Sequence, residues 1–359
     1  MTVFFAEPPP EHAEGGIDLA MSMLETYLDH AGIPLHRNLS SSGLDAVDPS
    51  TDVVHFHGLW QVDQTWMSFQ CRRLGIPYVV SPHGMLEPWA WHHKRWKKQP
   101  YYCLFERAHL NGAGAVLATS ALEEENLRSF VDTSPVTSIP LALPDDVPPD
   151  YEAARHELGW SENETVLLYL SRVHEKKGMH LLLRSIAALD DMPSRTRLVV
   201  VGDGPDGYLN RLHQIADAHA ASLPRIDWVG PVWGEKKWRY LQGADLFCLP
   251  THSENFGLVI LEASQVGTPV LTTDQTPWGF LEDWNAGIIT APRQRALEDG
   301  MRQFFSSFAW GDTDRAQFAT RIRQRFDLSV VGPKYVDMYR SVSKAGERRS
   351  APTLSSSPS

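Results

Sequence analysis

Short apolar runs alternate along most of the chain with longer segments whose apolar residues recur at helical spacing. In the first half, Val53–His57 (VVHFH) and Tyr78–Ser81 (YVVS) are typical of buried strands, and residues 17–31 are typical of an amphipathic helix. Strands that alternate with helices usually form a parallel sheet covered on both faces. The first half therefore predicts an α/β domain.

The alternation stops at residues 140–150 (PLALPDDVPPD), which are rich in proline and acidic residues, and then restarts with the strand-like run 166–170 (VLLYL). This interruption predicts a boundary between two similar α/β halves. The polar, Ser/Pro-rich end of the chain predicts disorder. The expected organisation is a first domain at 1–145, a second at 146–330, a last amphipathic helix at 331–345 and a disordered tail at 346–359.

Composition narrows the class of protein. The 359 residues are 42% hydrophobic and 21% charged, as in ordinary globular proteins, and suffice for two domains. The net charge of −11 argues against bulk nucleic-acid binding. Three cysteines imply no disulfide framework, and neither a signal peptide nor a membrane-spanning apolar run is evident. We expect a cytosolic protein, with peripheral membrane contact left open.

The most informative stretch is residues 251–263 (THSENFGLVILEA), which follow the apolar strand 244–250. A strand, a tight loop at Gly257 and a helix would present backbone N–H groups and a positive helix end to an anion. Glu254 would lie in the loop and Glu262 about two turns inside the helix. Carboxylates on both sides of an anion site suit a nucleotide-sugar, which carries hydroxyls on both sides of its phosphates.

A second charged motif opens the second half. Arg172 and Lys177 (SRVHEKKG) follow the strand 166–170, and ligands collect at such strand ends. A guanidinium fork and a compact ammonium group can converge on one diphosphate. A solvated basic loop is the alternative.

Two motifs in the first half follow or precede predicted elements. His83 lies between Pro82 and Gly84 at the carboxyl end of a strand, where it could meet a ligand or simply cap a turn. Gly15 and Gly16 precede the helix at 17–31 and could let the backbone approach a phosphate, although an ordinary turn explains them equally well.

Two further patterns are weaker. Residues 202–207 match G-x-G-x-x-G after a strand, but Pro205 stiffens the loop and this unit is the third of its half, so we do not favour NAD binding. His55 and His57 face the same side of a strand and could bind a metal. No carboxylate or cysteine cluster lies nearby, so a structural or substrate-contacting role is favoured.

Residues 89–102 (WAWHHKRWKKQPYY) are the most basic and aromatic stretch of this acidic chain. This composition suits a membrane interface or an anionic, lipid-linked acceptor, while a plain surface helix is the alternative. The basic residues Lys94, Arg95, Lys97 and Lys98 interleave with the aromatic residues Trp91, Trp96, Tyr101 and Tyr102.

Together, HSENFGLVILEA, SRVHEKKG and VSPHGML closely resemble the retaining glycosyltransferases of the group 1 (family 4) type. The resemblance implies the GT-B fold, in which two Rossmann-like domains with parallel sheets face each other across a cleft. It implies that Glu254 holds hydroxyls of the donor sugar and Glu262 holds the ribose. Arg172 and Lys177 would bind the departing diphosphate.

The same resemblance assigns further positions. His83 would contact the transferred sugar near the reacting carbon, and the last helix would cross back onto the first domain. No metal or other cofactor is expected. The remaining donor-binding positions would be Gly15 and Gly16 on the acceptor side of the diphosphate, Gly230 near the base, and Asn255, Phe256, Gly257 and Leu258 around the helix start.

The expected function is transfer of a sugar, with retention, from a UDP- or GDP-sugar to a saccharide or lipid-linked acceptor in cell-surface polysaccharide biosynthesis. The enzyme would act in the cytoplasm, at the inner face of the membrane. A GT-B nucleotide-sugar epimerase that needs no acceptor is the alternative. An inactive binding module and a nicotinamide-dependent oxidoreductase are less favoured.

Overall fold

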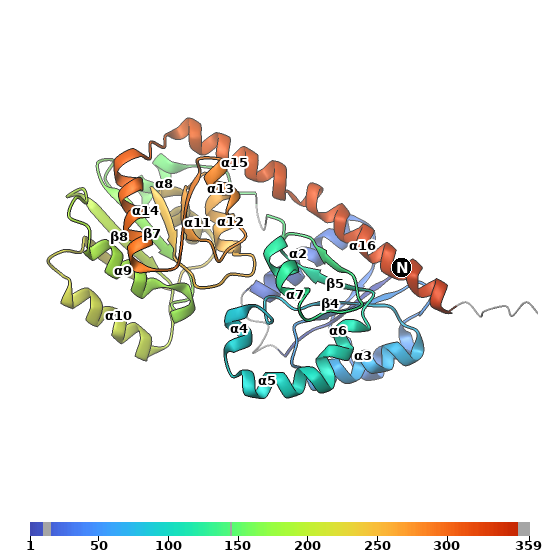
Figure 1. Ribbon diagram of the computed structural model, residues 1–359. Coiled ribbons are helices and arrows are strands. Elements are labelled where there is room, and N and C mark those ends of the chain that lie inside the picture. The colour runs from blue at the N-terminus through green and yellow to red at the C-terminus, as the bar shows by residue number, and fades with distance from the viewer. Residues whose placement is uncertain (10–15, 144–145, 351–359) are drawn as a thin grey trace, which may run out of the picture. The chain divides into compact units, whose positions relative to one another are not determined.

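The computed structural model describes residues 1–9, 16–143 and 146–350, with side chains up to residue 344. It divides into two compact units (Figure 1). The first contains Met1–Ala142 and the segment from Leu328 onward, and the second is Leu143–Asp327. The sequence placed these divisions after residues 145 and 330.

The first unit is built on a six-stranded sheet in which every neighbouring pair is parallel. Parallel pairing confirms the α/β class predicted from the alternating pattern. The strands, in spatial order, are β2 (Leu35–His36), β1 (Val3–Ala6), β3 (Val53–His57), β4 (Tyr78–Ser81), β5 (Ala115–Ala118) and β6 (Val136–Ser138).

Both faces of this sheet are buried, which explains why its strands are continuously apolar. Along β3, Val53 belongs to the core beneath one face, whereas Val54 and Phe56 belong to the core on the other. The elements around the sheet are α2 (Gly16–His30), η1 (Ser41–Ala46), α3 (Val62–Leu74), α4 (Pro88–His92), α5 (Arg95–Tyr101), the π-helical η2 (Tyr102–Glu106), α6 (Arg107–Asn111), α7 (Ala121–Leu127) and α16 (Leu328–Ser350).

The last helix, α16, belongs to the first unit although it follows the second in sequence. It packs against α2, β3 and β4. Gly332 allows the close approach to α2, because a Cβ there would lie 1.8 Å from the Tyr27 ring. The predicted disorder of residues 346–359 is wrong for 346–350, which continue α16, while 351–359 lie outside the described residues.

The second unit repeats the architecture with another six-stranded sheet, again parallel throughout. Its strands, in spatial order, are β12 (Gly287–Thr290), β11 (Val270–Thr273), β10 (Leu246–Leu249), β7 (Thr165–Leu170), β8 (Thr196–Val201) and β9 (Arg225–Gly230). Its helical elements are α8 (Tyr151–Leu158), η3 (Glu175–Lys177), α9 (Met179–Ala187), α10 (Asp206–Ala218), α11 (Glu235–Gly243), α12 (Leu258–Gln265), α13 (Phe280–Asp283), α14 (Gln294–Ser307) and α15 (Asp312–Phe326).

Within the ranges that the structure describes, no helix combines the length and apolarity needed to cross a bilayer.

Candidate functional site

The two charged motifs of the second unit meet at neighbouring strand ends. Because β7 and β10 are adjacent and parallel, the loops that follow them leave the same edge of the sheet. Lys177 comes from the first loop and Glu254 from the second, and the Lys177 ammonium forms an ion pair with the Glu254 carboxylate. Both side chains are largely buried, at 12% and 14% exposure, so the pair is shielded from bulk water.

Backbone contacts fix the position of Lys177. Gly178 has a φ of +73°, and a Cβ there would lie 1.9 Å from the carbonyl oxygen of Pro250. The His252 amide donates to the Lys176 carbonyl oxygen at 2.7 Å. These backbone contacts hold the two loops together. The backbone therefore fixes the positions from which the side chains of Lys177 and Glu254 meet.

Helix α12 begins at Leu258, four residues after Glu254. Gly257, the residue before the helix, adopts a φ of +81°. The ring of Phe256 is buried against Trp278 and Phe326, so the side chain at this predicted donor-binding position packs in the interior of the unit. Leu258 is the first helical residue, and the first backbone N–H groups of a helix have no partner within it.

Glu262 is paired with a lysine that the sequence did not single out. Lys237, in the first turn of α11, places its Nζ 2.8 Å from a Glu262 carboxylate oxygen. The carboxylate is almost fully buried, at 6% exposure. In the sequence, Lys237 is one of the polar residues of an amphipathic helix. No sequence signal distinguishes it from an ordinary lysine exposed to solvent.

The segment before α11 carries a second residue that sequence reasoning missed. Gly230 ends β9 with a φ of +79°, and Gly234 precedes α11 with a φ of +62°. Between them, Trp233 is 77% exposed. The exposed indole lies between two glycines, on the segment that leads to Lys237. We therefore regard this loop as a candidate ligand-binding surface.

Arg172 is exposed, and its backbone carbonyl accepts a hydrogen bond from Tyr169 at 3.2 Å. Across the part of the chain that the structure describes, its guanidinium forms no ion pair with a carboxylate. Asn255 is half-buried in the loop that carries Glu254. The structure therefore brings Lys177 and Glu254 into contact and leaves Arg172 turned to solvent.

The G-x-G-x-x-G stretch has a structural explanation. A Cβ on Gly202 would lie 1.9 Å from the Ser171 carbonyl oxygen, and one on Gly204 would lie 1.8 Å from that of Val173. The Val173 amide donates to the Asp203 carbonyl oxygen at 2.7 Å. Gly202 and Gly204 allow the loops after β7 and β8 to contact each other. This packing explains both glycines without a bound dinucleotide.

In the first unit, His83 adopts a left-handed conformation, with a φ of +51°, and Gly84 follows at +76°. A non-glycine residue rarely adopts this conformation unless its surroundings hold it there. His83 Nε2 lies 3.0 Å from His57 Nδ1, and the Gly84 amide donates to Glu123 at 2.7 Å. Burial lowers the pKa of His83 to about 4, so the imidazole is neutral near pH 7.

Glu123 holds this turn from the start of α7. Its buried carboxylate also accepts hydrogen bonds from the Thr119 amide at 2.7 Å and hydroxyl at 3.0 Å. Burial raises the pKa of Glu123 to about 7, although the hydrogen bonds from Thr119 and Gly84 oppose that rise. Glu123 is therefore a positioning residue for the turn that contains His83. Its sequence context did not indicate this role.

His55 and His57 are core residues. His55 lies 2.7 Å from both the Tyr339 hydroxyl on α16 and the Ser81 hydroxyl, so both of its ring nitrogens are engaged. Burial keeps the pKa of both histidines well below the usual value. Within the described residues, no three His, Cys, Asp or Glu side chains are grouped to hold a metal.

Of the predicted glycine pair, Gly15 lies outside the described residues. Gly16 is the exposed first residue of α2. A Cβ there would have no heavy atom within 4 Å, so the described packing gives no steric reason for glycine at this position.

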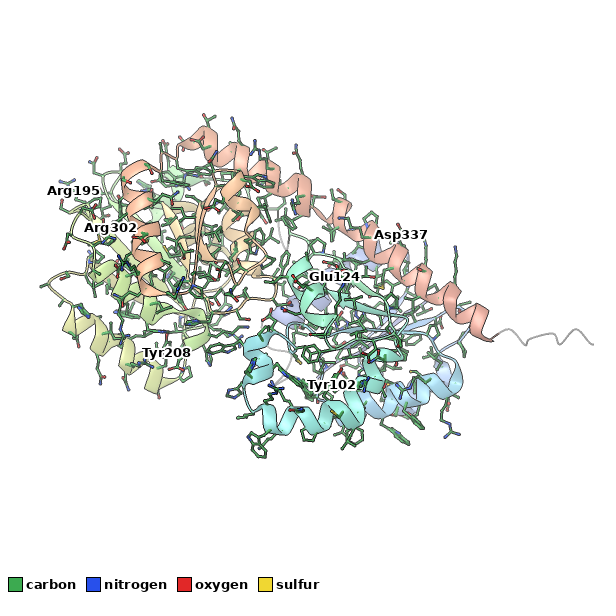
Figure 2. The ribbon with its side chains drawn as sticks, viewed as in Figure 1. Tyr102, Glu124, Arg195, Tyr208, Arg302 and Asp337 are labelled. Carbon is green, nitrogen blue, oxygen red and sulfur yellow. The ribbon has the colours of Figure 1, made fainter. Side chains whose placement is uncertain are left out.

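The basic and aromatic stretch at 89–102 is only partly on the surface. Lys98 donates to the Ala90 carbonyl oxygen at 2.5 Å, and Trp91 packs against the core. Tyr102, labelled in Figure 2, donates its hydroxyl hydrogen to the Phe130 carbonyl oxygen at 2.5 Å. The stretch forms α4, α5 and the start of η2, and Trp91, Lys98 and Tyr102 are half-buried, so the alternative of a plain surface helix does not describe these three residues.

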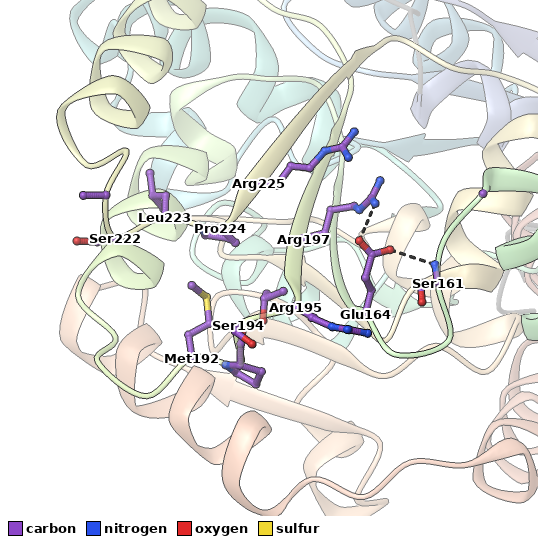
Figure 3. A pocket seen from close by; sticks show the side chains of 14 residues that line it. Ser161, Glu164, Met192, Ser194, Arg195, Arg197, Ser222, Leu223, Pro224 and Arg225 are labelled. Carbon is purple, nitrogen blue, oxygen red and sulfur yellow. Dashed lines mark hydrogen bonds and ion pairs between the residues drawn. The ribbon is translucent and has the colours of Figure 1, made fainter.

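A hollow of about 680 Å³ in the second unit is lined by arginines (Figure 3). Arg197 pairs with Glu164 at 2.7 Å and with Asp227 at 2.9 Å, and Arg225 pairs with Asp227 at 2.8 Å. These residues lie at the amino ends of the strands or within them. The ion pairs around this hollow therefore connect neighbouring strands. The hollow lies away from the carboxyl strand ends that carry Lys177 and Glu254.

Comparison with known proteins agrees with this arrangement. The family model described as "Glycosyl transferases group 1" matches residues 150–325, and that of the "Glycosyl transferase 4-like domain" matches residues 26–142. Among solved structures, the sucrose-phosphate synthase of Thermosynechococcus elongatus aligns over 96% of this chain and 100% of its own, with a TM-score of 0.78 and 18% identity. Anabaena HepE in complex with UDP aligns over 95% and 100%, with a TM-score of 0.74 and 19% identity.

Curated relatives carry the name D-inositol 3-phosphate glycosyltransferase. The protein from Stackebrandtia nassauensis is 28% identical over 73% of this chain and 66% of its own. The one from a Nocardioides species is 30% identical over 80% and 67%. The chain spans about half to two thirds of the length of such relatives. With both units matched to consecutive family models, the chain belongs to the group 1, family 4 glycosyltransferases and has their GT-B fold.

Proposed function

We propose that the protein transfers a sugar from a UDP- or GDP-sugar to a saccharide or lipid-linked saccharide acceptor, with retention of the anomeric configuration. The observation that carries this proposal is the largely buried Lys177–Glu254 pair at the carboxyl ends of β7 and β10, the second of which precedes α12. A cation and a carboxylate beside a helix start support this proposal, because they suit the phosphates and the hydroxyls of a sugar diphosphate.

In the proposed reaction, the bond between the sugar C1 and the diphosphate oxygen breaks, and its electron pair remains on the diphosphate. The acceptor hydroxyl oxygen forms the new bond to C1 from the same face and gives its proton to the departing phosphate oxygen. Lys177, Arg172 and the N–H groups at Gly257 and Leu258 stabilise the charge that develops. Neutral His83 would contact the sugar through hydrogen bonds.

The donor half is proposed as follows. Glu254 binds sugar hydroxyls, Glu262 binds the ribose, and the segment from Gly230 to Trp233 meets the base. Similar solved structures of HepE hold UDP, or UDP-glucose, which makes uridine nucleotides the first donors to test. The cations replace a metal in this proposal, so EDTA should leave transfer unchanged.

The site of action proposed is the cytoplasmic face of a membrane, in the assembly of cell-surface polysaccharide. The test is ligand-observed NMR with a panel of UDP- and GDP-sugars, followed by incubation of any bound donor with saccharide, inositol phosphate and lipid-linked acceptors. Transfer that fails in Lys177→Ala and Glu254→Gln, with unfolding midpoints preserved, supports the proposal. Unchanged transfer in both variants contradicts it, as does a new nucleotide-sugar formed from the donor alone, which indicates an epimerase.

A further inference from the structure

One buried imidazole of the first unit takes no part in the proposed reaction and is only half satisfied. The side chain of His57, on β3, is fully buried, with 0% exposure. Its Nδ1 lies 3.0 Å from Nε2 of His83, whereas its Nε2 has no hydrogen-bond partner within the described part of the chain. The rings of His55 and Phe5 lie against it, with centroids 4.0 and 4.5 Å away. Among the described residues, His83 therefore provides the one hydrogen bond to this imidazole.

A purely structural role explains His57 less well than it explains His55. Both ring nitrogens of His55 are matched by hydroxyl groups, as is usual for a buried polar side chain. A buried ring nitrogen without a partner costs free energy, and an apolar side chain of similar shape would avoid that cost. The cost at His57 is explained if its contact with His83 serves the site.

The geometry of the contact is that of a hydrogen bond in the plane of both rings. The centroids of His57 and His83 are 5.3 Å apart, and the ring planes differ by 16°. This separation exceeds the 3.0 Å between the nitrogens by about two ring radii, so the two nitrogens point directly at each other. Backbone pairing supports this arrangement. His57 lies opposite Ser81 in the register of β3 and β4, and the Gly58 amide donates to the Ser81 carbonyl oxygen at 2.8 Å.

This hydrogen bond decides which nitrogen of His83 carries the proton. Burial keeps both imidazoles neutral near pH 7, because it lowers the pKa of His83 to about 4 and that of His57 well below its usual value. Each neutral ring carries one proton. If His57 donates from Nδ1, His83 accepts at Nε2 and holds its own proton on Nδ1. If His83 donates from Nε2, its Nδ1 is bare and His57 holds its proton on Nε2. The two rings therefore have the same tautomer.

The unpartnered nitrogen of His57 distinguishes the two arrangements. The first leaves a bare nitrogen in the interior, and the second leaves an N–H group there without an acceptor. Buried N–H groups without an acceptor are rarer in proteins than under-satisfied acceptors, so the first arrangement is favoured. Nδ1 of His83, to which no described residue forms a hydrogen bond, then carries a proton that it can donate.

We propose that His57 is a positioning residue that fixes His83 as the tautomer protonated on Nδ1, so that His83 donates a hydrogen bond to an oxygen of the transferred sugar. The left-handed backbone of His83, with a φ of +51°, places the ring, and His57 places its proton. This role rests on the proposed function for the identity of the ligand. The tautomer is measured on the protein without donor or acceptor.

The experiment is two-bond proton–nitrogen correlation NMR of the full chain with isotope-labelled histidine, near neutral pH and without ligands. This spectrum separates protonated from bare ring nitrogens, which coordinates without hydrogens do not. The signals are assigned from the spectra of His57→Phe and His83→Gln. In the unchanged protein, both rings should be protonated on Nδ1 alone. A mixture of tautomers at His83, or a proton on Nε2 of either ring, overturns the proposal.

Variants at position 57 test whether the tautomer depends on this contact. His57→Phe keeps a ring in the core but removes the donor, so His83 should become a mixture of tautomers. His57→Asn places an amide N–H near the position of Nδ1 and should restore the Nδ1 tautomer. The matched control is His55→Phe, on the same face of β3, which should leave His83 unchanged. Unfolding midpoints establish that the variants are folded. An equal change of the His83 tautomer in His55→Phe and His57→Phe would contradict a specific role for His57.

Sugar transfer provides the functional measurement. His57→Phe should lower the transfer rate roughly three- to tenfold, the equivalent of one hydrogen bond, and His57→Asn should recover most of it. UDP binding should not change, because UDP lacks the sugar that His83 would contact. Unchanged transfer in a variant whose His83 tautomer is lost would overturn the proposed role. Absence of transfer by the unchanged protein would contradict the proposed function and not the fixed tautomer.

Discussion

The ammonium group of Lys177 is ion-paired with the carboxylate of Glu254, 77 residues later in the chain. Each charge therefore compensates the other in the ligand-free protein. In the proposed reaction, we expect a diphosphate at Lys177 to compete with Glu254 for the cation and so to release Glu254 for hydrogen bonds to sugar hydroxyls.

This competition predicts opposite effects on nucleotide binding. Lys177→Met should weaken UDP binding by roughly 10- to 150-fold, the equivalent of one charge-assisted hydrogen bond. Glu254→Gln should leave UDP binding unchanged or tighten it several-fold, because Lys177 loses its competitor, while sugar transfer falls at least about tenfold. Calorimetric titration and initial rates measure these changes. Equal weakening of UDP binding in both variants would contradict the competition.

The Lys237–Glu262 pair should contribute to the stability of the second unit. Lys237→Met leaves a nearly buried carboxylate without its cation, which should lower the free energy of unfolding by roughly 1–3 kcal/mol. The double variant Lys237→Met/Glu262→Gln should recover most of this loss. Urea unfolding measures the effect, and additive losses in the double variant would show that the two side chains are not coupled.

Trp233 should stack on the nucleobase. Trp233→Ala is expected to weaken UDP binding by roughly tenfold, and Trp233→Phe should restore most of the affinity because it keeps an aromatic face. The stability of the fold should not change, since the indole is 77% exposed. If Trp233→Ala binds UDP as tightly as the unchanged protein, the base lies elsewhere.

Glu123 should make stability depend on pH. Its pKa is raised to about 7 in the folded protein from an ordinary value of 4.5, so the native state holds a proton that the unfolded chain has lost. Relative to Glu123→Gln, the unchanged protein should therefore lose stability as the pH rises from 4.5 to 7, by at most roughly 3 kcal/mol.

The comparison with Glu123→Gln removes the opposite contribution of the histidines. His83 has its pKa lowered to about 4, so its stabilising contribution is lost as the pH falls from 6.5, in both proteins alike. Denaturant unfolding at several pH values provides the measurement. Parallel stability curves for the two proteins would show that the Glu123 carboxyl does not titrate in this range.

Two glycines of the G-x-G-x-x-G stretch provide a matched test of its structural role. Gly204→Ala places a Cβ 1.8 Å from a backbone oxygen and should lower the free energy of unfolding by more than about 2 kcal/mol. Gly207→Ala meets nothing within 4 Å and lies in the first turn of α10, so it should be neutral or slightly stabilising. Thermal unfolding distinguishes them, and saturable NADH binding would contradict the structural explanation.

The sequence alone determined the elements, the parallel sheets and the positions of the charged motifs, because periodicity and strand-end spacing are local properties. Glu254 and Lys177 could be singled out since each lies just after an apolar strand. Lys237, Glu123 and the role of His57 could not, because the partners of these side chains come from segments far away in the chain. Only the tertiary structure decided these, since packing alone determines which carboxylate a lysine reaches and which histidine His57 meets.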